Sequence, residues 1–188
     1  HTMRQLDRIR RFEHCARYLW SNPFYAFEKE LSRAQGASPE RHAGEGPTIL
    51  LCSGTGANKD FRGALRLFGR LGQEAATIRV RVLGFGDDSQ VAQQRIAAML
   101  PVTRGQFTVL PRMSLAEIVT EFRCSDLVWV HSRSEDFGRP VMEARMCGRP
   151  VVATDIGAFR QLRRLKHVHL YRGGSLADAM LAGWADSE

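Results

Sequence analysis

The stretch SEDFGRPVME, residues 134–143, contains two glutamates separated by seven other residues. Pro140 suits the first position of a helix, and the residues just before it bring no Ser, Thr or Asn side chain that could cap the helix start. The backbone N–H groups of Phe137, Gly138 and Arg139 are therefore expected to bind an anion at the positive end of the helix dipole. Gly138 lets a phosphate oxygen approach closely because it has no Cβ.

The two acids, Glu135 and Glu143, are expected to bind hydroxyl groups. Glu143 is predicted to lie in the first turn of the helix, where the helix dipole favours the ionised carboxylate. A carboxylate repels a phosphate, so its expected ligand is a vicinal diol, such as the two ribose hydroxyls of a nucleotide. Glu135 lies in the preceding loop and can reach a second polyol, such as a sugar ring. The alternative is that both are surface acids that flank a turn.

A second loop, SGTGANKDFRG at residues 53–63, follows the first predicted strand. Gly54 and Gly56 lie in its turn, and Lys59 and Arg62 stand near the start of the next helix. Both cations are expected to neutralise a diphosphate. A dinucleotide-binding fingerprint would need a third glycine where Lys59 stands, and a P-loop would need Gly-Lys followed by Ser or Thr, so neither motif is present.

From residue 48 onward, short apolar runs rich in β-branched residues alternate with helical patterns. The predicted strands are 48–52, 77–84, 107–110, 127–130, 150–154 and 167–171, and the predicted helices are 60–71, 88–99, 114–124, 140–147 and 175–184. Ser114 and Glu117 form a capping-box signature, and Asp87-Asp88 fits a turn and a helix cap. The alternation predicts an α/β fold, a Rossmann-like doubly wound parallel sheet. Ligands of such sheets bind at the carboxyl ends of the strands, where both loops lie.

Residues 1–46 are predicted to form an N-terminal helical arm and linker, and residues 47–188 a Rossmann-like domain. Apolar residues at helical spacing over 3–19 predict one amphipathic helix. A second helix begins at the Asn22-Pro23 start signal and ends near Gly36. The arm is expected to pack on this domain, with contact to a membrane surface as the alternative.

The composition fits a globular protein with a net charge of +7. Only three of its 27 basic residues are lysines, and the arginines are spread along the whole chain, so a nucleic-acid partner is not expected. Four cysteines without a CxxC pair fit the reduced thiols of a cytoplasmic protein. No apolar run reaches the roughly 20 residues needed to cross a bilayer. We expect a cytoplasmic location, with the inner face of the membrane as the second option.

The stretch SEDFGRPVMEARMCGRPVVATDIG, residues 134–157, resembles the donor-binding signature of the GT-B fold glycosyltransferases of the retaining group 1 family, which are glycosyltransferase family 4-like. Residues 48–185 match the order of that family's C-terminal domain. The resemblance implies that Glu143 holds the donor ribose and that Glu135, the candidate catalytic residue, contacts the transferred sugar. It also implies that residues 137–139 supply backbone donors around the sugar and diphosphate.

The resemblance further implies that Lys59 and Arg62 form the basic pair of the family. Its nucleobase contacts would lie at Leu110 to Arg112, and neither a cofactor nor a metal would be needed. Two positions depart from the family pattern. Asp136 stands where the family often has Gly, so its carboxylate could cap the helix itself, and Ala57 stands at the position of a family Arg.

The expected function is that of the nucleotide-sugar donor-binding domain of a retaining glycosyltransferase. Such an enzyme transfers a hexose from a nucleoside-diphosphate sugar to a glycan or lipid-linked acceptor. Because GT-B enzymes bind the acceptor on an N-terminal domain, the chain is expected to be a fragment that binds the donor and is inactive alone. Two alternatives stay open: a non-catalytic nucleotide-sugar-binding or partner-binding module, and a sugar-nucleotide epimerase of the same fold.

Overall fold

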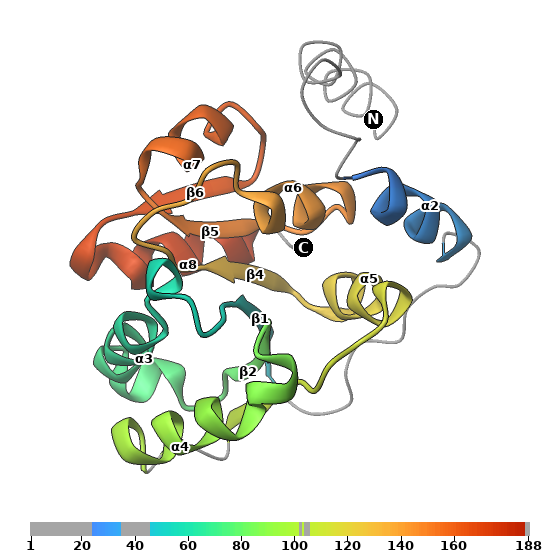
Figure 1. Ribbon diagram of the computed structural model, residues 1–188. Helices are drawn as coiled ribbons and strands as arrows, with labels where there is room; N and C mark the ends of the chain where they lie inside the picture. Colours follow the sequence, from blue (N-terminus) through green and yellow to red (C-terminus); the bar gives the residue numbers. More distant parts are fainter. Residues whose placement is uncertain (1–23, 35–45, 102, 104–105, 187–188) are drawn as a thin grey trace.

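The computed structural model describes residues 24–34, 46–101, 103 and 106–186. Within these residues, six parallel strands form one sheet in the order β3-β2-β1-β4-β5-β6 (Figure 1). The strands are β1 (Thr48–Cys52), β2 (Arg79–Leu83), β3 (Phe107–Val109), β4 (Leu127–Val130), β5 (Val151–Thr154) and β6 (Val168–Tyr171). Each lies inside a predicted strand, and the predicted Rossmann-like α/β fold is confirmed.

One helix precedes β1, others connect successive strands of the sheet, and one follows β6. They are α2 (Tyr25–Ala34), α3 (Phe61–Arg70), α4 (Ser89–Met99), α5 (Leu115–Cys124), α6 (Arg139–Met146), α7 (Gly157–Leu162) and α8 (Leu176–Ala185). Short 3₁₀ turns, η1 (Ala57–Lys59) and η3 (Gly86–Asp88), follow β1 and β2. The sequence did not predict α7, because six residues are too few to show a helical period. In the described part of the chain, no helix has the length and apolar character needed to span a bilayer.

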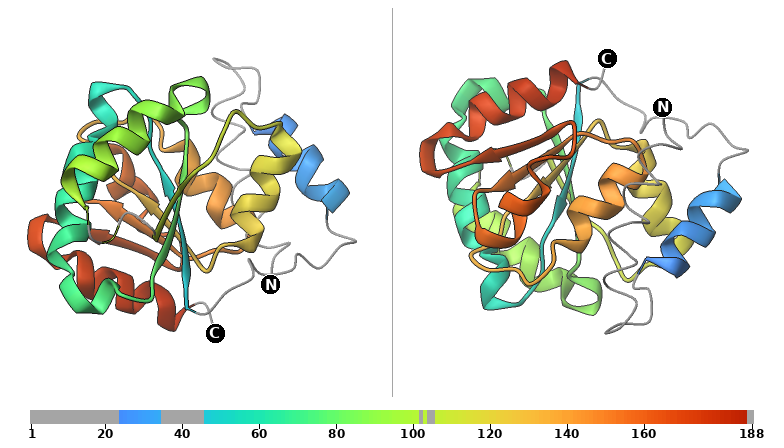
Figure 2. Two further views of the ribbon diagram at one scale, coloured as in Figure 1. Left: turned by 90° about the horizontal axis from the view of Figure 1, so that it is seen from below. Right: turned by 90° about the horizontal axis from the view of Figure 1, so that it is seen from above.

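Helices cover both faces of the sheet (Figure 2). In β1, Ile49 and Leu51 point into a core covered by α3, α4 and α8. Leu50 and Cys52 point into a second core covered by α2, α5, α6 and α7. All five residues of β1 are buried, because the strand lies in the middle of the sheet between two apolar layers. This position explains why residues 49–52 of β1 are all apolar rather than alternating.

Helix α2, the described part of the N-terminal arm, packs against α5. The ring of Phe27 meets the ring of Phe122 edge-on, with centroids 5.7 Å apart. Both side chains are buried, and Arg123 on α5 donates a hydrogen bond to the last carbonyl of α2. The expectation that the arm packs on the domain is confirmed for this helix. The first predicted arm helix, the Asn22-Pro23 start and most of the linker lie outside the described residues.

Candidate functional site

The start of α6 has no side-chain cap. Gly138 is the N-cap residue, in the left-handed conformation at φ 76° and ψ 42°, and Asp136 is exposed and makes no capping bond. Gly138 is required twice over, because a Cβ there would also lie 2.7 Å from Cε1 of Phe159 on α7. The helix begins at Arg139 with Pro140 second, one residue earlier than predicted. The uncapped helix start expected from the sequence is therefore present.

Glu143 lies in the second turn of α6 and is 7% exposed. Its Oε1 accepts a hydrogen bond of 3.1 Å from Nη2 of Arg139. Burial raises the pKa of Glu143, while the charges of Arg139 and Lys59 only partly oppose this. The prediction that Glu143 lies in the first turn, with its ionised form favoured, is wrong. The helix starts earlier than expected, and burial outweighs the dipole.

Lys59 and Glu135 form an ion pair between the loops that follow β1 and β4. The Lys59 Nζ lies 2.5 Å from Oε2 of Glu135, and both side chains are mostly buried. The Ser132 hydroxyl lies 3.5 Å from the same carboxylate oxygen. The backbone N–H of Arg133 donates to the carbonyl oxygen of Asn58 at 2.7 Å, which ties the two loops together. The two residues predicted to bind separate parts of a ligand thus contact each other.

Gly54 and Gly56 shape the loop after β1. A Cβ at Gly54 would lie 3.1 Å from the carbonyl oxygen of Gly84, at the end of β2. Gly84 has φ 114°, and a Cβ there would overlap the carbonyl oxygen of Ser53. Gly56 precedes η1, and its carbonyl accepts a hydrogen bond from the N–H of Lys59 at 2.9 Å. These glycines therefore let two loop backbones touch and turn the chain so that Lys59 reaches Glu135.

The other two predicted basic residues lie apart from this pair. Arg62 is exposed in the first turn of α3. Arg112 makes an exposed ion pair with Asp87, 3.0 Å between Nη1 and Oδ2. Asp87 and Asp88 do form the predicted turn, but the expected cap is wrong, because Asp88 at the N-cap of α4 makes no side-chain cap bond. Among the described residues, no hydrogen bond or ion pair joins Arg62 or Arg112 to Lys59 or Glu135.

Phe137 carries its side chain toward the N-terminal arm. Its ring lies 5.7 Å from the ring of Phe24, the residue before α2, measured between centroids. Phe24 is buried, whereas Phe137 keeps 38% of its surface exposed. The backbone of Phe137 thus lies beside the uncapped start of α6, and its ring links that loop to the arm.

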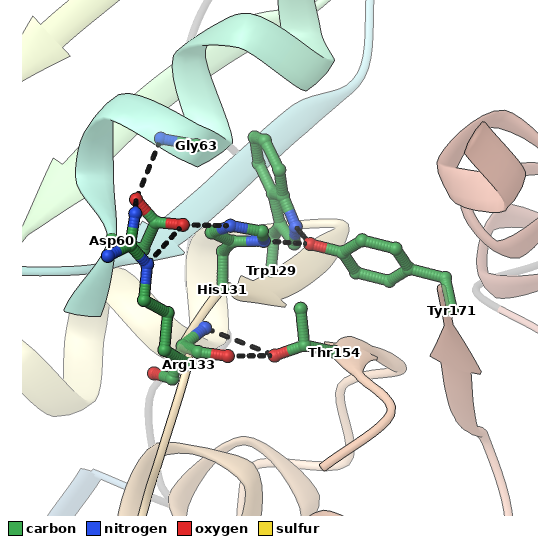
Figure 3. A network of polar contacts seen from close by, with 8 residues as sticks. Asp60, Gly63, Trp129, His131, Arg133, Thr154 and Tyr171 are labelled. Carbon is green, nitrogen blue, oxygen red and sulfur yellow. Dashed lines mark hydrogen bonds and ion pairs between the residues drawn. The ribbon is translucent and has the colours of Figure 1, made fainter. Parts of the chain in front are cut away.

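A network of polar contacts joins Asp60, the residue after Lys59, to the end of β4 (Figure 3). Its central residue is His131, which follows β4 and contacts the Tyr171 hydroxyl and the Asp60 carboxylate. Asp60 follows Lys59, adopts φ 36°, and accepts a hydrogen bond of 3.2 Å from the N–H of Gly63. Arg133 makes an ion pair of 3.0 Å with the same carboxylate.

This network was not predicted from the sequence. Two signals were present: an aspartate at the start of a predicted helix, where N-caps are common, and a histidine directly after a predicted buried strand. Neither signal shows that the two side chains meet. That contact depends on the loops after β1 and β4 lying side by side, which follows from the sheet order.

The site combines positive charge with two carboxylates. Lys59, Arg139 and the start of α6 are positive, and Glu135 and Glu143 are the acids. Among the described residues, no group of three or more His, Cys, Asp or Glu side chains is placed to hold a metal ion. The arrangement suits a ligand that carries both anionic and hydroxyl groups.

The family model described as "Glycosyl transferases group 1" matches residues 36–169. A D-inositol 3-phosphate glycosyltransferase from Rhodococcus jostii (strain RHA1) is 36% identical over 100 residues, which cover 52% of this chain and 22% of that protein. The chain thus spans about a fifth of the length of this curated relative.

Two solved structures share the fold. The C-terminal domain of a glycosyl transferase group 1 family protein from Francisella tularensis aligns with a TM-score of 0.58 and 17% identity, covering 76% of this chain and 80% of that chain. The pneumococcal O-GlcNAc transferase GtfA, solved with UDP and GlcNAc, aligns with a TM-score of 0.55 and 17% identity, covering 80% of this chain and 29% of that chain. The sheet is that of one half of a GT-B fold. Since the family model covers more than half of its residues, the chain belongs to the glycosyl transferases of group 1.

Proposed function

We propose that this chain is the nucleotide-sugar donor-binding domain of a retaining glycosyltransferase that moves a hexose from a nucleoside-diphosphate sugar to a glycan or lipid-linked acceptor. One observation carries the proposal: the uncapped start of α6 lies together with the buried Glu143 and the Lys59–Glu135 pair. The helix start and Lys59 supply positive charge for a diphosphate. The two carboxylates supply acceptors for ribose and sugar hydroxyls.

Each side chain has a separate role in this proposal. The diphosphate binds at the N–H groups that begin α6 and draws the Lys59 ammonium from Glu135. Glu143 accepts hydrogen bonds from the ribose hydroxyls, and Glu135, once released, accepts from the transferred sugar. As the bond from the anomeric carbon to the diphosphate oxygen breaks, negative charge grows on the leaving phosphate. Lys59 and the helix start stabilise that charge, so we propose that no metal ion or cofactor is required.

The acceptor is proposed to bind outside this chain. The segment that matches makes up only 22% of the relative from Rhodococcus jostii. A chain of this length is therefore proposed to bind the donor without transferring its sugar. We propose a cytoplasmic site of action, at the inner face of the membrane where the acceptor is lipid-linked.

A binding panel tests the proposal. Thermal melts and calorimetry would measure the binding of three nucleotides, UDP, GDP and ADP, and of three nucleotide sugars, UDP-glucose, GDP-mannose and ADP-glucose. A ligand at 100 times its Kd stabilises the native state by about 2.7 kcal/mol, or roughly 5–10 °C in Tm at this chain length.

Lys59→Ala and Glu143→Gln should each weaken binding at least tenfold. Lys166→Ala, an exposed lysine just before β6, is the matched control and should bind like the parent. Absence of any shift with all six ligands would refute the proposal.

A second candidate is a binding module without turnover. The Lys59–Glu135 pair favours it, because each side chain already satisfies the other and a donor must separate them. Assays of donor turnover by the full-length gene product distinguish the two candidate functions. A transferase converts or slowly hydrolyses the donor, whereas a pure binding module leaves it intact.

A further inference from the structure

A continuous chain of polar contacts runs from the core to the residue after Lys59. The Trp129 indole N–H donates to the Tyr171 hydroxyl oxygen at 2.8 Å. The Tyr171 hydroxyl lies 2.5 Å from Nδ1 of His131, and Nε2 of His131 lies 3.5 Å from Oδ2 of Asp60. Figure 3 shows these side chains joined one to the next by their contacts, with Tyr171 extending from β6. Trp129 and Tyr171 are fully buried, so the inner end of the chain is fixed by packing.

The chemistry of the two ends sets the direction of the hydrogen bonds. Trp129 can only donate, and the Asp60 carboxylate can only accept. Because Asp60 only accepts, the ring proton of a neutral His131 lies on Nε2, facing Asp60, and Nδ1 is unprotonated. The Tyr171 hydroxyl, whose oxygen accepts from Trp129, then donates its own proton to Nδ1. The contacts therefore select one tautomer of the neutral imidazole. A proton added to Nδ1 would meet the Tyr171 proton and leave the hydroxyl without an acceptor.

The surroundings of His131 also favour the neutral ring. Burial lowers the pKa of His131, and the charges of Arg133 and Arg66 lower it further, whereas Asp60 raises it. Asp60 and Tyr171 do not change charge between pH 5.5 and 7.5. Hydrogen bonds from Arg133 and Gly63 keep the pKa of Asp60 low despite its burial, and burial raises the pKa of Tyr171. Of the three residues His131, Asp60 and Tyr171, His131 is therefore the one whose charge can change near that range.

The outer end of the chain holds a strained residue. Asp60 adopts the left-handed conformation, φ 36° and ψ 48°, which costs a non-glycine residue about 1 kcal/mol or more. Its carboxylate is held by His131, by Arg133 and by the N–H of Gly63. A Cβ at Gly63 would lie 2.3 Å from Oδ2 of Asp60 and 2.8 Å from Nε2 of His131, so only glycine leaves room for this meeting. These contacts lock the turn that carries Lys59 onto the loop that carries Glu135.

We propose that His131 is a positioning residue of the donor site: as the neutral Nε2–H tautomer held by Tyr171, it fixes Asp60 and thereby aims Lys59 at the donor diphosphate. This inference rests on the proposed function. It adds a dependence on pH, because protonation of His131 places a second donor against the Tyr171 hydroxyl and removes the acceptor of its proton, which disturbs the contacts that hold the Lys59 turn.

The test measures binding of whichever nucleotide sugar in the panel binds tightest, with calorimetry at pH 7.5 and pH 5.5. A nucleotide sugar is the probe because its doubly esterified diphosphate does not titrate between these values, unlike the terminal phosphate of a free nucleoside diphosphate. His131→Leu should weaken binding about tenfold at pH 7.5, and Tyr171→Phe about threefold. The parent should lose affinity at pH 5.5. His131→Gln, which can donate to Asp60 and does not titrate, should bind within twofold of the parent at pH 7.5 and keep that affinity at pH 5.5.

A double-mutant cycle separates positioning from a general structural role. If His131 acts through Lys59, His131→Leu should have no further effect in the Lys59→Ala background. The inference would be overturned, without affecting the proposed donor site, if His131→Leu bound with the same affinity as the parent. It would also be overturned if the effects of His131→Leu and Lys59→Ala on binding were fully additive. Failure of the parent to bind any nucleotide sugar would instead overturn the proposed function. If His131→Leu does not fold, as judged by circular dichroism, the Tyr171→Phe affinity and the pH response of His131→Gln decide the question.

Discussion

The Lys59 ammonium and the Glu135 carboxylate lie 2.5 Å apart, although 76 residues separate them in the chain. They meet because β1 and β4 are neighbours in the sheet and both loops leave at the carboxyl ends of these strands. A phosphate must compete with Glu135 for the ammonium group. The pair therefore holds Lys59 ready while limiting its affinity for phosphate.

Glu135→Gln should separate binding of the nucleotide from binding of its sugar. Without the carboxylate, Lys59 is released to the diphosphate, so UDP, GDP or ADP affinity should rise about three- to fivefold, the scale of a partly exposed ion pair. The matching nucleotide sugar should gain nothing over the free nucleotide, because the acceptor for the sugar hydroxyls is weakened. Calorimetry with both ligands measures the difference, and Glu30→Gln on α2 is the control. A loss of nucleotide affinity as large as that of Lys59→Ala would contradict this role.

Glu143→Gln should stabilise the protein while weakening donor binding. The folded-state pKa of Glu143 is raised by burial, so the folded protein binds its proton more tightly than the unfolded chain does. Below about pH 4 both states are protonated and the residue has no effect on stability. As pH rises through the folded pKa, the buried charge destabilises the fold. At pH 8 the variant should be more stable by about 1 kcal/mol, or roughly 2–4 °C in Tm.

Thermal melts at pH 5 and pH 8 check the sign for Glu143→Gln. The gap between variant and parent should widen at the higher pH. A variant less stable than the parent at pH 8 would show that the carboxylate has contacts stronger than its burial cost.

Gly138→Ala should cost much more stability than Gly148→Ala. The two glycines have nearly the same left-handed backbone, φ 76° and φ 75°, but only Gly138 has a neighbour, Phe159, within contact distance of a new Cβ. Gly148→Ala should lose about 1 kcal/mol from backbone strain alone. Gly138→Ala should lose about 2–4 kcal/mol, because overpacking adds to the same strain. Denaturant unfolding measures both, and equal losses would mean that α7 moves away freely.

The sequence predicted those features that depend on neighbouring residues. Ser114 and Glu117 form the expected capping box, with the Ser114 N–H donating to Glu117 at 2.7 Å. The apolar runs predicted the six strands. The clearest runs are those of β1 and β4, which are buried on both faces of the sheet. The uncapped start of α6 also followed from local residue types.

The missed features depend on tertiary contacts. The raised pKa of Glu143 follows from burial by packed elements, which its place in the helix does not reveal. The contact between His131 and Asp60 joins residues 71 positions apart, and Tyr171 comes from a strand 40 positions further on. No pattern along the chain encodes such distances. Whether Arg62 and Arg112 bind a donor stays a prediction, because both side chains are exposed and Arg112 is paired with Asp87.

The sheet order shows that the site is assembled from two separate runs of strands. The chain adds strands outward from β1 to β3, then returns to the centre and adds β4 to β6 in the opposite direction. Lys59 and Asp60 belong to the first run, whereas His131, Glu135 and Glu143 belong to the second. Any molecule held between them fastens one run to the other. Binding at this site would therefore show that both runs have assembled. A fragment that contains only one of the two runs, released by proteolysis, should not retain the ligand.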